Sequence, residues 1–292
     1  MSGSKINPPI VVGVDGSRAA AGAVRWAAAE AAAHHTPLHL VSAIGQPIDY
    51  GPGLGFAPII DDAFREAGAE TLATAEKSAA EAATLVDDAV ISTFVVEAPP
   101  IPVLVNRSKE ARLLVVGTTG KGAFRRGLLG SVSTALARHA QCPVVAVPAT
   151  DNRMPDRLSG GVVVGVDGSP CSMAAIAIAF DEASHRGVEL VAVHTWSEFN
   201  RYLSRTELQE QAAGVLAESL AGFAEQYPDV IVRRVVVEDH PARRLLAESE
   251  HAQLIVVGSH GRGGFAGMTL GSVGQAVLHG TDIPIIIARQ ED

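Results

Sequence analysis

Two glycine-rich segments carry the residue types and the spacing of an anion-binding loop. The first, from Gly117 to Val132, reads GTTGKGAFRRGLLGSV, and the second, from Gly258 to Val273, reads GSHGRGGFAGMTLGSV. Each follows the pattern G-x-x-G, nine residues, G-S. We expect the Gly-Ser pair to open a helix, whose first N–H groups lack partners and carry the positive end of the dipole. A helix start of this kind binds anions, most often phosphate.

The alternative is that these glycines only make turns, but the same spacing in two separate segments favours phosphate binding. Neither segment is a Walker A loop, because no GxxxxGK[ST] occurs, and neither is the GxGxxG turn of dinucleotide-binding proteins. The first segment carries Lys121, Arg125 and Arg126, whereas the second has only Arg262. This difference in charge predicts tighter phosphate binding at the first segment.

An aspartate follows a short apolar run in each half of the chain. The heptapeptide VVGVDGS occurs at Val11–Ser17 and again at Val163–Ser169, so Asp15 and Asp167 end equivalent strands. A carboxylate would repel phosphate, so its role at a ligand site is to accept hydrogen bonds from ribose hydroxyls or from a base. An Asx turn or a helix cap explains the aspartates equally well.

Elements of alternating type must position these residues. In the first half we expect strands at 10–14, 38–44, 89–96, 113–117 and 144–147, with helices at 17–35, 62–85, from 102, and at 131–139. The second half repeats this order from 162, with strands near 190–194, 230–237, 254–258 and 285–288. Short apolar runs without alternation indicate strands covered on both faces. The predicted fold is therefore α/β, with two tandem doubly wound, mainly parallel five-stranded sheets and flanking helices.

The repeat also defines the expected domains, which are residues 1–148 and 161–292, joined by a linker at 149–160. The composition of 47% hydrophobic and 19% charged residues excludes intrinsic disorder. A net charge of −9 argues against nucleic acid or an anionic membrane as a partner. No apolar run is long enough to span a membrane. The two cysteines show no metal-binding spacing and suit a reducing cytoplasm, which is the expected location.

Together, the G-x-x-G, nine residues, G-S pattern and the aspartate that closes the first strand resemble the tandem universal stress proteins of actinobacteria. The resemblance covers about residues 9–148 and 161–289. It implies one ATP per half, with Mg²⁺ as a possible companion. It also implies ribose contacts for Asp15 and Asp167, adenine contacts near Ala43 and Val193, and self-association through the last strands, at 143–147 and 284–288.

The candidate nucleotide-binding residues fall into two matching sets. In the first half they are Gly13, Asp15, Ala43, Gly117, Thr118, Thr119, Gly120, Lys121, Gly122, Gly130, Ser131 and Val132. In the second half they are Gly165, Asp167, Val193, Gly258, Ser259, His260, Gly261, Arg262, Gly263, Gly264, Gly271, Ser272 and Val273. No catalytic residue and no protein ligand for a metal is assigned.

Three functions remain open on this basis. The first is a regulatory ATP-binding protein of the stress response, because two nucleotide loops occur without an evident catalytic base. The second is a slow ATPase or phosphotransferase, for which one carboxylate per site is a poor set of groups. The third is an interaction scaffold in which the nucleotide is structural. The first is the preferred interpretation.

Overall fold

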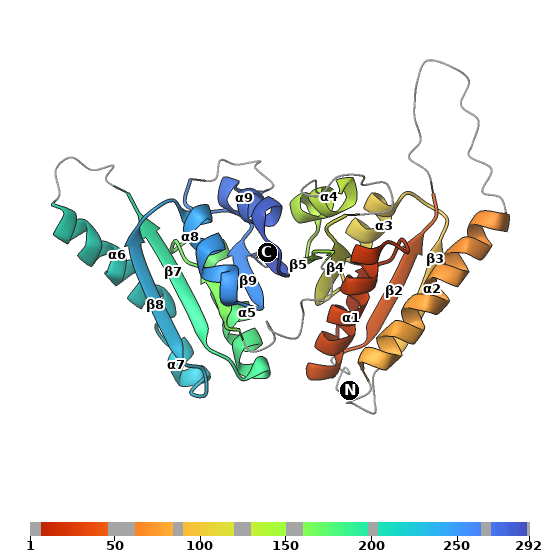
Figure 1. Ribbon diagram of the computed structural model, residues 1–292, viewed down its shortest axis with the longest axis horizontal. Helices are drawn as coiled ribbons and strands as arrows, with labels where there is room; N and C mark the ends of the chain where they lie inside the picture. The colour runs from red at the N-terminus through yellow and green to blue at the C-terminus, as the bar shows by residue number, and fades with distance from the viewer. Residues whose placement is uncertain are drawn as a thin grey trace, which may run out of the picture. The chain divides into compact units, whose positions relative to one another are not determined.

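The computed structural model describes residues 7–45, 62–83, 90–119, 130–149, 160–197, 204–263 and 270–290. The chain divides into two compact units, Met1–Ala149 (unit 1) and Thr150–Asp292 (unit 2). The described part of each unit contains five parallel strands, in the order β3-β2-β1-β4-β5 in unit 1 and β10-β9-β6-β7-β8 in unit 2 (Figure 1). The expected α/β fold with two mainly parallel sheets is confirmed.

Strands and helices alternate along unit 1. In chain order the elements are β1 (Ile10–Gly13), α1 (Arg18–Ala33), β2 (Leu38–Ala43), α2 (Asp62–Ala82), β3 (Ile91–Val96), α3 (Pro100–Arg107), β4 (Leu113–Gly117), α4 (Ser131–His139) and β5 (Val144–Val147). Helices α1 and α2 pack together on the sheet, while α3 and α4 form a second pair. The sheet is therefore doubly wound.

Unit 2 repeats this order and, among the described residues, shows one further short helix. Its elements are β6 (Val162–Gly165), α5 (Pro170–Arg186), β7 (Leu190–Trp196), α6 (Arg205–Leu220), α7 (Phe223–Gln226), β8 (Val232–Glu238), α8 (Pro241–Glu248), the 3₁₀ turn Ser249–His251, β9 (Leu254–Gly258), α9 (Ser272–Gly280) and β10 (Ile285–Ala288). Helices α5 and α6 pack against each other, and α8 packs against α9.

The central strands form because their side chains are apolar on both faces. β1 and β6 read IVVG and VVVG, and every residue before the terminal glycine is at most 1% exposed. Both strands pair in the same register with their neighbours: Ile10 is opposite Leu38 and Leu113, and Val162 is opposite Leu190 and Leu254. Because the registers match, the carboxyl ends of the strands are arranged in the same way within each unit.

Serine caps fix the start of the first helix in each unit. Ser17 Oγ accepts the N–H of Ala20, and Ser169 Oγ accepts the N–H of Ser172, with Pro170 as the first helical residue. An N-cap serine satisfies one of the N–H groups that the first turn leaves without a partner. The helices therefore begin directly after the turns that hold Asp15 and Asp167.

Most element bounds agree with the expectation from sequence, and the differences have local causes. β4, β5, β9, β10 and α4 begin and end at the expected residues. The third helix begins at Pro100 rather than near 102, because Pro99 and Pro100 supply the N-cap and the first helical residue. β7 continues to Trp196, two residues beyond the expected end, because its partner β8 continues to Glu238. The expected linker lies almost wholly outside the described residues.

No helix in the described part of the chain combines the length and the apolar character required to cross a membrane.

The glycines that end β4 and β9 allow the sheet to approach the first helix of its unit closely. A Cβ on Gly117 would lie 2.6 Å from the carbonyl carbon of Ala19, and one on Gly258 would lie 2.9 Å from that of Cys171. Because these neighbours are backbone atoms, they cannot move aside as a flexible side chain would. Glycine is therefore required at both positions to keep the strand end against the helix.

We expect Gly258→Ala to lower the free energy of unfolding by about 1–3 kcal/mol, because the new methyl group overpacks the contact with α5. Gly214→Ala is the matched control: it lies in the interior of α6, nothing is found within 4 Å of the new Cβ, and the change should stabilise by about 0.5–1 kcal/mol. Urea unfolding followed by circular dichroism measures both changes. Equal midpoints for the two variants would contradict the close-approach argument.

Candidate functional site

A cavity of about 340 Å³ opens at the carboxyl ends of β6, β7 and β9 in unit 2. This edge of a doubly wound sheet is where ligands of such folds bind. Its volume lies within the range of small-molecule sites. The described residues that line it are Gly165, Val166, Asp167, Ser172, Val193, Thr195, Pro241, Leu245, Val257, Gly258, His260, Gly261, Arg262, Gly263, Gly271, Ser272, Val273 and Gly274.

Asp167 connects the turn after β6 to the glycine-rich loop after β9. Its Oδ1 accepts the N–H of Ser169 at 2.9 Å, and its Oδ2 accepts the N–H of Arg262 at 3.0 Å. A Cβ on Gly261 would lie 2.5 Å from Oδ2, so only glycine allows this approach. The Asx turn and the ligand role considered from the sequence are compatible, because each carboxylate oxygen retains a second acceptor site.

The loop after β9 is held by two further hydrogen bonds, and unit 1 contains the same pair. In unit 2, Ser169 Oγ donates to the carbonyl of His260 at 3.3 Å, and Gly271 N–H donates to that of Ser259 at 2.7 Å. In unit 1, Ser17 Oγ donates to the carbonyl of Thr119 at 3.2 Å, and Gly130 N–H donates to that of Thr118 at 2.7 Å. The two loops therefore share one arrangement at both of their described ends.

The start of α9 borders the cavity. Its N-cap is Gly271, which has no side chain, so no side-chain hydrogen bond caps the helix. Ser272, Val273 and Gly274 of the first turn all line the cavity. Uncapped N–H groups and the helix dipole make this end attractive to an anion. Arg262 is the only lysine or arginine among the described lining residues.

The cavity lining also includes apolar side chains. Val193 on β7, Leu245 on α8 and Val257 on β9 supply them, and Thr195 on β7 lines the cavity as well. A surface of this composition suits the flat face of an aromatic ring system. The cavity thus offers groups for negative charge and groups for an apolar ring.

The pairing register shows which residues of the two units correspond on the second strand. Gly13 is opposite Val41, and Gly165 is opposite Val193, so Val193 corresponds to Val41. The residue that corresponds to Ala43 is therefore Thr195. It lies two positions beyond Val193, the residue that was matched with Ala43 from the sequence. Thr195 lines the cavity and was missed, because periodicity alone does not set the register of a strand.

Most residues proposed from the second half line this cavity. Ser259 does not: it is 2% exposed, and its Oγ lies 3.1 Å from His260 Nδ1 and 3.5 Å from Cys171 Sγ. Gly264 lies outside the described residues. In unit 1, Gly120, Lys121 and Gly122 also lie outside them, as do Arg125 and Arg126. Gly13, Asp15, Ala43, Gly117, Thr118, Thr119, Gly130, Ser131 and Val132 are at or near the carboxyl ends of β1, β2 and β4 or the start of α4.

Sequence reasoning also missed residues that tertiary packing brings to the site. Pro241 and Leu245 come from α8, which packs against β6 and β7. The proline that opens α8, and the matching Pro100 of α3, were available as a signal for a helix start.

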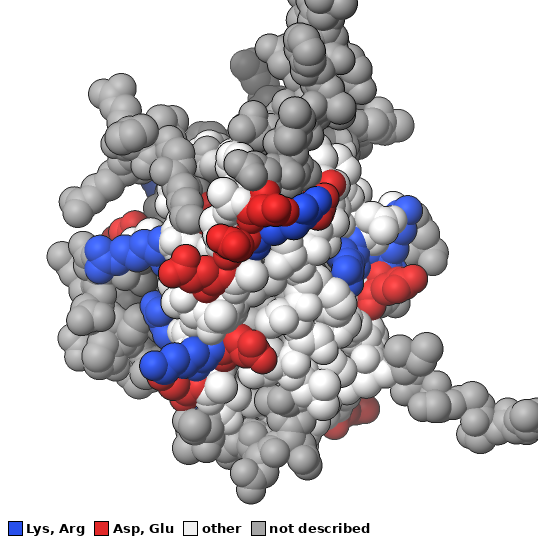
Figure 2. Space-filling model, turned by 90° about the vertical axis from the view of Figure 1, so that its right-hand side faces the viewer, with Lys and Arg blue, Asp and Glu red and all other residues white. Residues whose placement is uncertain are grey.

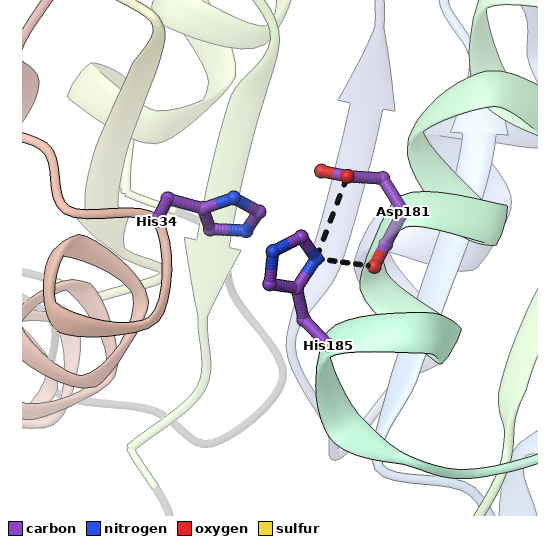
Figure 3. Close-up of side chains that lie close together, drawn as sticks. All are labelled: His34, Asp181 and His185. Atoms are coloured by element: carbon purple, nitrogen blue, oxygen red, sulfur yellow. Dashed lines mark hydrogen bonds and ion pairs between the residues drawn. The ribbon is translucent and has the colours of Figure 1, made fainter.

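Two histidines of unit 2 have structural surroundings. His194 is 8% exposed, and its Nδ1 lies 2.7 Å from the carbonyl oxygen of Val166. His185, in the last turn of α5, has its Nδ1 at 2.9 Å from the carbonyl of Asp181 and at 3.4 Å from its carboxylate (Figure 3). Neither histidine lines the cavity, so we assign neither a ligand contact.

Comparison with known proteins identifies the family. Residues 7–148 and 161–289 both match the family model described as the universal stress protein family. The chain belongs to this family. Universal stress protein Rv2005c of Mycobacterium tuberculosis is 46% identical over 285 residues, which cover 96% of this chain and 97% of that protein. Universal stress protein Rv2623 of the same organism is 44% identical over 294 residues, or 99% of each chain.

A solved structure shares the architecture of this universal stress protein. The crystal structure of a universal stress protein from Archaeoglobus fulgidus has a TM-score of 0.70 and is 20% identical, and the match covers 98% of this chain and 97% of that chain. At this identity the likeness supports the fold alone. Another solved family member, described as a complex with cAMP, is 30% identical and covers 50% of this chain with a TM-score of 0.36.

We expect Asp167→Ala to release the loop at Arg262, because the carboxylate accepts its backbone N–H. Loss of a hydrogen bond to a charged group costs about 1.5–3 kcal/mol, so the Arg262 amide should exchange roughly 10- to 100-fold faster. Hydrogen exchange of peptides that cover residues 259–263 measures this. Asp229→Ala is the control, since Asp229 accepts a hydrogen bond from Ser184 and does not line the cavity. Unchanged exchange in Asp167→Ala would contradict the assigned anchor.

Proposed function

We propose that each unit binds one ATP and that the protein is a nucleotide-dependent regulator of the stress response. The observation that supports this most directly is the cavity of unit 2. It combines a carboxylate, a glycine-rich loop and an uncapped helix start with apolar side chains. These are the groups that ribose, phosphates and a purine base require.

Each part of the nucleotide has a matching part of the cavity. The phosphates would lie against the first turn of α9 and beside Arg262, where N–H groups and a guanidinium supply positive potential. The ribose hydroxyls would donate to Asp167, whose oxygens accept backbone N–H groups and keep further lone pairs. The adenine would lie between Val193 and Leu245, with the Thr195 hydroxyl available for a hydrogen bond.

Unit 1 supports the same proposal through its matching framework. Asp15 Oδ1 accepts the N–H of Ser17 at 2.9 Å, as Asp167 accepts that of Ser169. α4 likewise starts at an N-cap glycine, Gly130, without a side-chain cap. A second ATP would therefore meet the same kinds of groups.

Magnesium ions commonly accompany ATP, but this cavity offers a poor set of ligands for one. Asp167 is the only carboxylate among the described lining residues, and both its oxygens already accept N–H groups. Mg²⁺ is held by carboxylates together with phosphates and water. We therefore assign it no protein ligand here.

The same shortage of groups favours binding over catalysis. Phosphoryl transfer requires metal-coordinating residues and a group that orients the nucleophile. One carboxylate that anchors a loop supplies neither role.

Slow hydrolysis and a scaffold with structural nucleotide are the alternatives. Protein purified without added nucleotide and then denatured tests the first alternative: released ATP supports binding without turnover, whereas released ADP points to hydrolysis. Partner binding or assembly that ignores nucleotide would instead point to the scaffold.

The location and assembly of the protein complete the proposal. Cys142 and Cys171 are not joined by a disulfide, which fits the cytoplasmic location that we propose.

We also propose self-association through the last strand of each unit, β5 or β10, within or between chains. Both strands are wholly apolar, reading VVAV and IIIA.

Ser272→Asp is a sharp test of phosphate binding at α9. The exposed Ser272 is the first helical residue, so a carboxylate there stabilises the helix dipole and yet repels phosphate. We expect ATP affinity at this site to fall at least about tenfold, or about 1.4 kcal/mol. Isothermal titration should then show one tight site per chain in place of two, and the double variant with Ser131→Asp should show none.

The matched control is Gln275→Asp, which adds the same charge later on the same helix. Gln275 is exposed and does not line the cavity, so ATP affinity should stay near that of the unmodified protein. If Ser272→Asp and Gln275→Asp bind ATP alike, the phosphates do not lie at the start of α9. A titration with cAMP in parallel shows whether the site prefers a nucleotide with a full triphosphate.

A further inference from the structure

The two outermost strands, β3 in unit 1 and β8 in unit 2, occupy equivalent positions but have different free edges. In β3, the carbonyls of Val90 and Val96 accept the N–H groups of Leu38 and Ile44 at 2.9 and 3.0 Å, so these residues face β2. In a parallel ladder, alternate residues point their backbone groups to opposite sides. Ile91, Thr93 and Val95 therefore direct their N–H and C=O groups away from the sheet.

These outward groups of β3 have no hydrogen-bond partner within the described residues. The three residues that carry them are all β-branched and uncharged. Val95 is 39% exposed, and Val90 and Phe64 beside the strand are 63% and 50% exposed. Figure 2 shows this side of the molecule, where a broad surface without charged side chains is bordered by acidic and basic groups. An uncharged strand edge of this kind is a template for pairing with another strand.

The charges close to the end of β3 are already paired with one another. Arg65 Nε lies 2.5 Å from Glu97 Oε1, and Arg65 Nη1 lies 2.8 Å from Asp62 Oδ1. The hydrogen bond from Arg65 holds the pKa of the Glu97 carboxyl below its usual value. These three groups carry one positive and two negative charges, so they leave one net negative charge near the end of the edge.

The edge of β8 is blocked instead. The N–H of Leu190 binds the carbonyl of Ile231, so Arg234 and Val236 point their backbone groups outward. Gln209 Nε2 donates to the outward carbonyl of Val236 at 3.2 Å, and Trp196 Nε1 donates to Gln209 Oε1 at 2.7 Å. A side chain thus occupies the position that an added strand would need.

We propose that β3 pairs antiparallel with β3 of a second copy of this chain, about a twofold axis at Thr93. The two Thr93 residues then face each other, and Ile91 of each copy faces Val95 of the other. All outward N–H and C=O groups of the three residues find partners, and β-branched residues pair across the strands.

The second copy is the occupant that the charges favour. The same operation applied to β8 would place Arg234 against Arg234, because Arg234 corresponds to Thr93 in the two registers. Like charges directly opposite each other destabilise a strand pair. The outer edge at β3 can therefore pair with the same edge of a second copy, whereas the outer edge at β8 cannot.

Cysteine cross-linking tests this pairing directly. In a hydrogen-bonded antiparallel pair the facing Cα atoms lie about 5.5 Å apart, which is within the range that a disulfide spans. Full-length Thr93→Cys should give a disulfide-linked product of twice the chain mass under mild oxidation, in a yield that falls on dilution. Arg234→Cys, exposed at the corresponding position of β8, is the matched control and should give no more product than the unmodified chain.

Sedimentation provides a second measurement that does not need an added cysteine. Thr93→Lys places two ammonium groups at the axis and should halve the particle mass, whereas Thr93→Ser should leave it unchanged. The proposal is overturned if Thr93→Cys links no better than Arg234→Cys, or if Thr93→Lys leaves the mass unaltered. Pairing through β5 or β10 would not link Thr93, so the two association proposals fail or succeed separately, and neither depends on nucleotide.

Discussion

One serine in each unit performs two tasks on which the site depends. Ser169 Oγ accepts the N–H of Ser172 and so starts α5, and the same hydroxyl donates to the carbonyl of His260. Ser17 does the same for α1 and Thr119. The helix that covers the sheet and the loop that borders the cavity are therefore held by the same side chain. A hydroxyl is suited to this because it donates and accepts at once.

The close approach at the end of β9 and the bonds of Asp167 act together with this serine. Gly258 lets the strand end lie against the first turn of α5, and the carboxylate then holds the loop at Arg262. The three contacts join the segment from β6 to the start of α5 with the end of β9, which lies far along the sequence. The site is thus a product of the sheet topology, since a doubly wound order brings the ends of β6 and β9 side by side.

Much of this arrangement could be predicted from the sequence because its signals are local. Apolar runs of strand length predicted β4, β5, β9 and β10 to the residue, and serine and glycine marked the start of α1, α4, α5 and α9. Contacts across the sheet were harder. Thr195 was missed because the register of β7 follows from its neighbours, and Leu245 was missed because α8 reaches the cavity only through tertiary packing.

The absence of a side chain at the N-cap of α9 has a consequence for how long the protein persists in the cell. A helix that begins at Gly271 keeps N–H groups that only water or a ligand can satisfy. An anion bound there acts as the missing cap, and a ligand at about 100 times its dissociation constant adds about 2.7 kcal/mol to folding stability. Resistance to proteolysis would then rise and fall with the supply of ligand, so turnover of the chain would itself report on metabolic state.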